Sequence, residues 1–241
     1  MSKEKAVVLL SGGIDSSTCL GIAVDKYGAE NVLALSLTYG QKHEKELDCA
    51  KAVAEHYDVK FHSMDLSSVF VFSDCPLLQG RKDMEHGSYA EQMAKNGEGT
   101  VATYVPFRNG LMLSTAAAIA ASIDASVIYY GAHSDDAAGR AYPDCTPDFE
   151  SAMDEAIFEG TGQKVRLEAP LLNMNKAEVV KTGLSLGVPY ELTWSCYEGG
   201  DLQCGTCGTC IDRRHAFDSN GVCDPVGYMT IGDVIEPKNR I

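Results

Sequence analysis

Residues 11–18 read Ser-Gly-Gly-Ile-Asp-Ser-Ser-Thr, which combines paired glycines with hydroxyl side chains. Because glycine has no Cβ, the backbone can approach an anion closely and point successive N–H groups toward it. Asp15 would repel a bare phosphate, so it indicates a cation such as Mg²⁺ between the two. The lysine of a Walker A loop and the G-x-G-x-x-G dinucleotide pattern are both absent. The segment predicts a phosphate-binding loop, with a plain tight turn as the weaker alternative.

A second group with its own chemistry consists of four bunched cysteines: Cys196, Cys204, Cys207 and Cys210. The glycines between the last three let the chain turn so that thiolates come within about 2.3 Å of one metal ion. Four thiolates with no open position predict a structural, tetrahedral Zn²⁺ site. An iron–sulfur cluster is the alternative, but the x3-Cys-Pro continuation of the ferredoxin pattern is missing.

The first part of the chain alternates apolar runs with helical periodicity. Strands are expected at 6–10, 32–37 and 59–64, and helices at 15–27 and 44–57. Continuous apolar runs of strand length are typical of strands buried on both faces. This β-α-β-α-β order predicts an α/β fold with a doubly wound parallel sheet.

The later elements continue the same pattern after an irregular insertion at 67–99, which is either a lid or a segment without a role. A buried helix that is apolar nearly all round is expected at 108–124, and further helices at 147–159 and 175–186. Strands are expected at 126–132 and 164–167. Residues 1–192 would form the nucleotide-binding α/β domain, and 193–241 a small, cysteine-rich zinc-binding region.

Composition excludes several classes of protein. The 241 residues include 20 basic and 34 acidic ones, a net charge of −14. Such a chain lacks the basic footprint with which proteins bind DNA or tRNA. No targeting segment and no run of about 18 apolar residues is found, so a cytoplasmic protein outside the membrane is expected. The bunched cysteines also suit a reducing compartment.

The Ser-Gly-Gly-x-Asp-Ser segment resembles the pyrophosphate loop of ATP pyrophosphatases (PP-loop enzymes). Together with the cysteines, further segments resemble the 7-cyano-7-deazaguanine synthase (QueC) family over most of the chain. They are Tyr-Gly-Gln-Lys-His at 39–43, Val-Pro-Phe-Arg-Asn-Gly at 105–110, Tyr-Pro-Asp-Cys-Thr-Pro-Asp-Phe at 142–149, Asn-Lys-Ala-Glu at 175–178 and Trp-Ser-Cys-Tyr at 194–197. The insertion at 67–99 does not align with the family.

The resemblance implies an adenine-nucleotide alpha hydrolase-like fold and a ligase that forms C–N bonds. Family members convert 7-carboxy-7-deazaguanine and ammonia to the 7-nitrile through an adenylated carboxylate and an amide. The reaction uses ATP and Mg²⁺ and belongs to queuosine precursor synthesis. Because the substrate is a free base, no direct nucleic-acid partner is expected. A homodimer is expected, partly from the resemblance.

The resemblance also implies roles for the residues of this sequence that match the motifs of the family. Asp15 is expected to contact Mg²⁺, Arg108 to pair with the substrate carboxylate, and Lys176 to stabilise charge at phosphorus. ATP is expected along the loop and the helix that follows it: Leu10, Ser11, Gly12, Gly13, Ile14, Asp15, Ser16, Ser17, Thr18, Cys19 and Leu20. The substrate is expected at Lys42, His43, Arg108, Asn109, Asp144 and Asp148.

Plainer roles remain open for several of these residues. Asn109, Asp144 and Asp148 could cap helices, while Lys42 and His43 could lie in a solvated loop and Lys176 on the surface. His133, Asp135 and Asp136 follow the fourth expected strand at the same sheet edge, without an assigned role.

Three other functions are weighed against the synthase. A PP-loop enzyme acting on tRNA would need a basic face or an RNA-binding appendage. A zinc-stabilised regulator would bind ATP without turning it over. A built-in glutaminase would need a second domain, so free ammonia is the expected nitrogen donor.

Overall fold

The computed structural model describes residues 4–42, 45–79, 100–101, 103–137, 141–198, 200–229 and 234–235. Five parallel strands form one sheet in the order β3-β2-β1-β4-β5. They are β1 (Ala6–Leu9), β2 (Val32–Thr38), β3 (Lys60–Asp65), β4 (Val127–Tyr129) and β5 (Arg166–Glu168). The expected doubly wound sheet is confirmed. Because the strand order reverses between β1 and β4, their carboxyl ends form the crevice where such sheets bind ligands.

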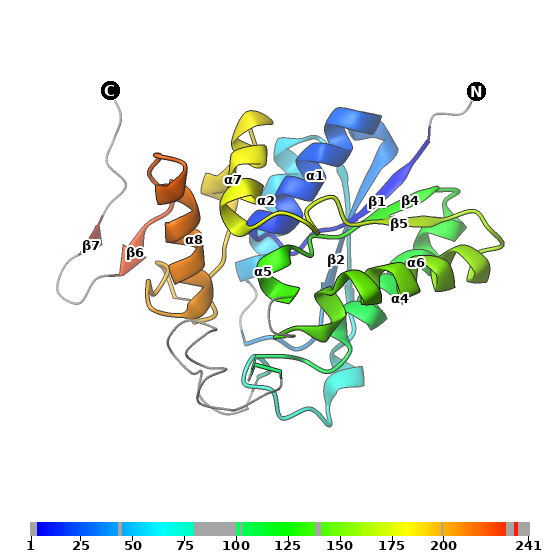
Figure 1. Ribbon diagram of the computed structural model, residues 1–241, viewed down its shortest axis with the longest axis horizontal. Helices are drawn as coiled ribbons and strands as arrows, with labels where there is room; N and C mark the ends of the chain where they lie inside the picture. Colours follow the sequence, from blue (N-terminus) through cyan, green and yellow to red (C-terminus); the bar gives the residue numbers. More distant parts are fainter. Residues whose placement is uncertain are drawn as a thin grey trace.

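Helices cover both faces of this sheet (Figure 1). One face carries α1 (Ile14–Tyr27), α2 (Lys45–His56) and α7 (Lys176–Ser185), and the other carries α4 (Arg108–Ser122) and α6 (Pro147–Gly160). The short α5 (Ser134–Ala137) follows β4. Beyond α7 lie α8 (Gly208–Ser219) and a small antiparallel pair, β6 (Tyr228–Met229) and β7 (Val234–Ile235).

Alternation along β1 divides the core into two layers. Ala6 and Val8 pack with α1, α2 and α7, whereas Val7 packs with α4 and α6. All three side chains are fully buried. Two-sided burial explains why the central strands read as uninterrupted apolar runs, and why the sequence places them correctly.

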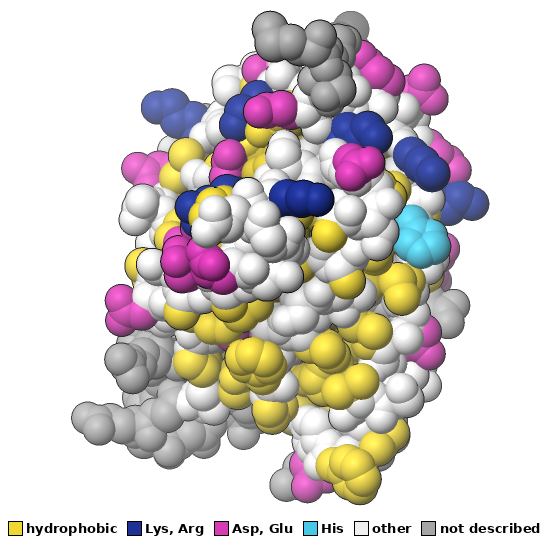
Figure 2. Space-filling view, turned by 90° about the vertical axis from the view of Figure 1, so that its right-hand side faces the viewer, with side chains coloured by type: hydrophobic (Ala, Val, Ile, Leu, Met, Phe, Trp, Pro, Cys, Tyr) yellow, Lys and Arg dark blue, Asp and Glu magenta, His cyan; other side chains and the backbone are white. Residues whose placement is uncertain are grey.

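Two expectations differ from the structure. Helix α4 is not buried all round, because Ser114, Ala118, Ala121 and Ser122 are exposed. Small side chains make this outer face look like core in a sequence, although only one face meets the sheet. Figure 2 shows apolar side chains gathered in the lower half of the molecule, the side of the sheet that α4 and α6 cover in Figure 1.

The second difference concerns the region after residue 192. Helix α8 was not expected, and its Ala216 and Phe217 pack into the same core layer as α1 and α7. The rings of Tyr190 and Phe217 meet edge to face at 5.4 Å between centroids. The cysteine region therefore shares its hydrophobic core with the α/β domain.

Of the expected insertion at 67–99, the structure describes residues 67–79, which begin with a 3-10 helix, Ser67–Phe70. Residues 80–99 lie outside the described residues. Within the described parts of the chain, no helix is both long and apolar enough to cross a membrane.

Candidate active site

A cavity of about 280 Å³ opens at the carboxyl ends of β1, β2 and β4. Its wall comes from the loop after β1, the segment after β4, and the first turns of α2, α4, α7 and α8. Residues that the sequence marked at separate places meet here: Ser11, Asp15, Arg108, Asn109, His133 and Lys176.

The loop at 11–16 is closed by its own hydroxyl groups. Ser16 Oγ accepts the N–H of Ser11 at 3.1 Å and lies 3.0 Å from Ser11 Oγ. Helix α1 begins at Ile14, and no side chain caps its N-terminus. The first-turn N–H groups and the positive end of the helix dipole are thus directed at the cavity, which suits an anionic phosphate.

Gly12 is required by the packing of this loop. Its φ of 85° lies in the left-handed region, and an added Cβ would come within 2.4 Å of the Glu46 carbonyl oxygen. The first turn of α2 therefore lies directly on the loop. Ile14 is buried as expected, 1% exposed, and fixes the loop to the core.

The rest of the expected nucleotide segment faces inward. Ser17, Thr18, Cys19 and Leu20 are all fully buried within α1. Thr18 Oγ1 lies 2.8 Å from the hydroxyl of Tyr190. These four residues do not line the cavity, whereas Leu10, Ser11, Gly13, Ile14, Asp15 and Ser16 do.

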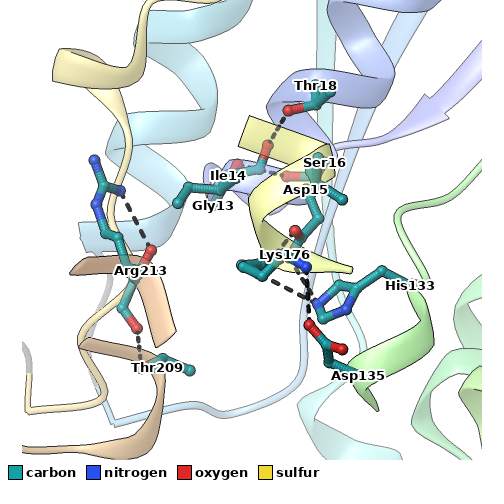
Figure 3. A network of polar contacts seen from close by, with 12 residues as sticks. Gly13, Ile14, Asp15, Ser16, Thr18, His133, Asp135, Lys176, Thr209 and Arg213 are labelled. Atoms are coloured by element: carbon teal, nitrogen blue, oxygen red, sulfur yellow. Dashed lines mark hydrogen bonds and ion pairs between the residues drawn. The ribbon is translucent and has the colours of Figure 1, made fainter. Parts of the chain in front are cut away.

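Asp15 and Lys176, 161 residues apart, form an ion pair in the cavity (Figure 3). Lys176 Nζ donates to Oδ1 at 2.7 Å and to Oδ2 at 2.6 Å, and His133 Nε2 lies 3.3 Å from the same nitrogen. Burial alone would raise the pKa of Asp15, but the charges of Lys176 and His133 hold it below its usual value. The carboxylate therefore stays ionised, as a cation ligand must be.

Local structure fixes Lys176 in place. It is the first residue of α7, whose capping box joins Asn175 and Glu178. The backbone N–H of Lys176 also donates to Asp135 Oδ2 at 2.8 Å. This hydrogen bond connects the segment after β4 with the segment after β5. Asp135, which had no assigned role, therefore positions Lys176.

Arg108 lies on the opposite wall of the cavity, at the start of α4. Its guanidinium donates to the Tyr39 hydroxyl at 3.1 Å and lies 5.0 Å from the ring centroid of that tyrosine. Burial alone would lower the pKa of Arg108, but neighbouring groups led by Tyr39 raise it, so the guanidinium remains charged. A fixed cation here can pair with a carboxylate.

Of the other expected substrate residues, Asn109 lines the cavity, whereas Lys42, Asp144 and Asp148 do not. Asp144 is buried and accepts the backbone N–H of Asn109 at 3.0 Å, while the Asn109 amide lies 3.2 Å from Cys145 Sγ. Neither Asp144 nor the exposed Asp148 lines the cavity. Lys42 lies outside the lining as well, with its N–H bonded to Leu77. His43 and the side chain of Asp136 lie outside the described residues.

Glu46 is a cavity residue that the sequence did not single out. Glu46, in the first turn of α2, is half-buried and lines the cavity. Burial raises its pKa to about 7, against the attraction of Arg108. In the sequence it stands in a charged run between Lys45 and Asp48, which reads as a solvated helix face; only the fold turns it inward.

The four cysteines converge as their spacing predicts. Their Sγ atoms all lie within 4.8 Å of one another. Cys196, Cys207 and Cys210 are fully buried. Backbone N–H groups of Cys204 and Cys207 donate to the sulfurs of Cys196 and Cys204 at 3.2 and 3.3 Å, which fixes the orientation of these side chains. A compact set of four soft donors, three of them buried, fits a tetrahedral Zn²⁺ ion.

The cysteine cluster is connected to the phosphate loop through one residue. Trp194 donates its backbone N–H to the Gly12 carbonyl at 2.9 Å and its indole N–H to the Cys196 carbonyl at 2.7 Å. Lys45 Nζ lies 4.4 Å from the centroid of the Trp194 ring. Trp194, which lines the cavity, therefore joins the cysteine cluster to the phosphate loop.

Known proteins match this chain along almost its whole length. The family model "Queuosine biosynthesis protein QueC" matches residues 5–221. A 7-cyano-7-deazaguanine synthase of Archaeoglobus fulgidus is 44% identical over 223 residues, covering 92% of this chain and 89% of its own. One of Oceanobacillus iheyensis is 40% identical over 236 residues, covering 95% of this chain and all of its own.

Among solved structures, the NMN synthetase of Francisella tularensis has a similar fold. The TM-score is 0.51 at 18% sequence identity, covering 92% of this chain and 79% of that one. At this identity the likeness supports the fold alone.

Proposed function

Because the chain belongs to the QueC family of queuosine biosynthesis proteins, we propose that it converts 7-carboxy-7-deazaguanine and ammonia to 7-cyano-7-deazaguanine at the expense of ATP. It would be a ligase that forms C–N bonds. The observation that carries the proposal is one cavity holding an uncapped helix N-terminus, the Asp15–Lys176 pair and Arg108. These parts suit a phosphate chain, a cation and a carboxylate.

In the first step, a carboxylate oxygen attacks the α-phosphorus of ATP, the bond to the β-phosphate breaks, and pyrophosphate leaves. The first-turn N–H groups of α1 would hold the phosphates, and Asp15 would hold a Mg²⁺ ion, which supplies positive charge next to them. Lys176, already 2.6 Å from Asp15, stabilises the charge that develops at phosphorus. Arg108 orients the attacking carboxylate.

In the second step, ammonia attacks the acyl carbon, AMP leaves, and loss of a proton gives the amide. The amide oxygen then attacks the α-phosphorus of a second ATP and displaces pyrophosphate. The C–O bond breaks, AMP leaves with that oxygen, and loss of the two N–H protons yields the nitrile. The acid anhydride formed in the first step must be kept from water, which a cavity closed on several sides favours.

The cysteine cluster would hold Zn²⁺ as a structural ion, since four thiolates leave no position open for substrate. A homodimer, a cytoplasmic location and the absence of a nucleic-acid partner stay predictions. The mass of the native protein checks the first of these, and tRNA binding at physiological salt checks the last.

The experiment that tests the proposal is mass spectrometry of a reaction containing 7-carboxy-7-deazaguanine, ATP, Mg²⁺ and ammonium. We expect the nitrile and AMP, both abolished in Asp15→Ala and retained in Asp25→Ala, whose exposed carboxylate lies on the same helix. ATP binding without any change in the deazaguanine would refute the proposal and favour another carboxylate-activating enzyme of the PP-loop type.

A further inference from the structure

The Glu46 carboxylate is a half-buried hydrogen-bond acceptor that lines the cavity. Among the described residues, no N–H or O–H group donates to it, although the charge of Arg108 attracts it and Tyr39 and Cys49 lie within electrostatic range. The α2 backbone that carries it packs on Gly12, so the residue is held at the phosphate loop rather than on a mobile surface.

The other carboxylates of the cavity are already engaged. Both oxygens of Asp15 accept from Lys176, and Asp135 accepts the backbone N–H of the same lysine. Asp212 also has a partner. Glu46 is thus the cavity carboxylate, within the described chain, whose oxygens are still available to a ligand.

Leaving a carboxylate unpaired in a half-buried place is costly, because it has lost part of its water. A carboxylate in that state at a cleft is characteristic of a binding or catalytic group. A ligand that brings two N–H donors would satisfy both oxygens.

The surroundings of Glu46 suit a flat heterocycle. Tyr39, Leu47 and Leu77 line the same cavity as Glu46, and Tyr39 and Leu77 belong to one buried apolar cluster. Arg108 is fixed against Tyr39 beside them. A cation for a carboxylate and an acceptor for N–H donors therefore flank one apolar wall.

We propose that Glu46 reads the guanine-type edge of the substrate, accepting the ring N1–H on one carboxylate oxygen and the 2-amino group on the other. This inference rests on the proposed function and makes Glu46 its specificity-determining residue. Two parallel N–H···O⁻ bonds match the two adjacent donors of that edge, and bonds to an ionised acceptor are the strong ones. A hypoxanthine-type ring lacks the 2-amino donor and would leave one oxygen unpaired.

The test compares kcat/KM for 7-carboxy-7-deazaguanine and its analogue without the 2-amino group, 7-carboxy-7-deazahypoxanthine. We expect the unaltered enzyme to prefer the 2-amino substrate by about 10- to 100-fold, the worth of one hydrogen bond to a charged group. In Glu46→Gln the preference should fall to within about threefold, because the amide turns an N–H toward one of the donors. Asp48→Asn, an exposed change on the same helix, should keep the full preference.

The outcomes of this experiment distinguish a failure of the Glu46 assignment from a failure of the proposed function. If the unaltered enzyme does not transform 7-carboxy-7-deazaguanine, the proposed function fails. If it does, and Glu46→Gln keeps the full preference at whatever rate, the assignment of Glu46 is overturned. Should Glu46→Gln fail to fold, Glu46→Asp retains the charge one methylene further away and should show a reduced preference; an unchanged preference there also overturns the assignment.

Discussion

At the scale of single residues, the pairing of Asp15 with Lys176 places two opposite charges in the cavity where we propose that ATP and Mg²⁺ bind. Each residue was selected from its own local motif, but their separation of 161 positions hides the 2.6 Å contact from any sequence pattern. Lys176 balances the charge of the Asp15 carboxylate, which is the group that would hold Mg²⁺ in the proposed reaction. Contacts within the protein therefore set the positions and charges of both side chains.

We predict that Lys176→Met lowers kcat by about 10²- to 10³-fold, because a preorganised cation at the reacting phosphorus is lost. Lys181→Met is the matched control, since Lys181 lies on the same helix and is exposed. Steady-state release of AMP measures both. A Lys176→Met enzyme with more than a tenth of normal kcat would show that the lysine is structural.

Glu46 gives a prediction about stability and pH. Its pKa of about 7 in the folded protein exceeds that of an unfolded glutamate, about 4.3, so between these values the folded state binds more protons. Stability must then fall as pH rises through that window. We predict that Glu46→Gln, which cannot ionise, gains stability relative to the unaltered protein from about pH 5 to pH 8. Urea unfolding at several pH values measures this; a constant difference would contradict it.

At the scale of elements, the loop after β1 is supported from two sides. The first turn of α2 lies on Gly12, and Trp194 ties the same glycine to the backbone of Cys196. The glycines and cysteines could be identified in the sequence because both types are needed at fixed spacing. The hydrogen bonds of Trp194 could not be predicted from the sequence, because a single tryptophan forms no spaced pattern.

We predict that losing the metal weakens nucleotide binding as well as the fold. Cys207→Ser should lose zinc, melt at a lower temperature and bind ATP about tenfold more weakly, since Trp194 would no longer be held to Gly12. Cys223→Ser is the control, because Cys223 is exposed and outside the cluster. Metal analysis, thermal melting and calorimetric titration with ATP give the three readouts. An unchanged ATP affinity in the zinc-free variant would show that the cysteine cluster does not support the phosphate loop. Full activity without zinc would refute a structural role for the metal.

At the scale of the whole molecule, the sheet and its five long helices were expected from apolar runs and helical periodicity, and the structure confirms them. Helix α8 was not, because its sequence between Gly208 and Ser219 is largely polar with few apolar positions. Its place depends on contacts that no local pattern encodes. Arg213, fully buried on α8, bonds Asp224 through two nitrogens at 2.7 and 2.9 Å and reaches Thr193 at 2.8 Å.

We predict that Arg213→Met destabilises the protein by about 3–5 kcal/mol, because Asp224 would remain buried without its cation. Arg214→Met, an exposed neighbour on the same helix, should change the free energy of unfolding by less than about 0.5 kcal/mol. Denaturant unfolding of both variants measures the difference. A loss under about 1 kcal/mol in Arg213→Met would show that the pair merely offsets its own desolvation.

The shared core beneath α8 has a consequence for how this kind of protein can change over time. Phe217 packs in the core layer that also contains Tyr190 and Leu20. A chain that ended at residue 192 would therefore expose these apolar side chains to water. Recombination between related enzymes therefore cannot exchange the cysteine segment as a separate module. We expect the cysteine segment and the α/β fold to be inherited together, because substitutions at their shared core affect the packing of both.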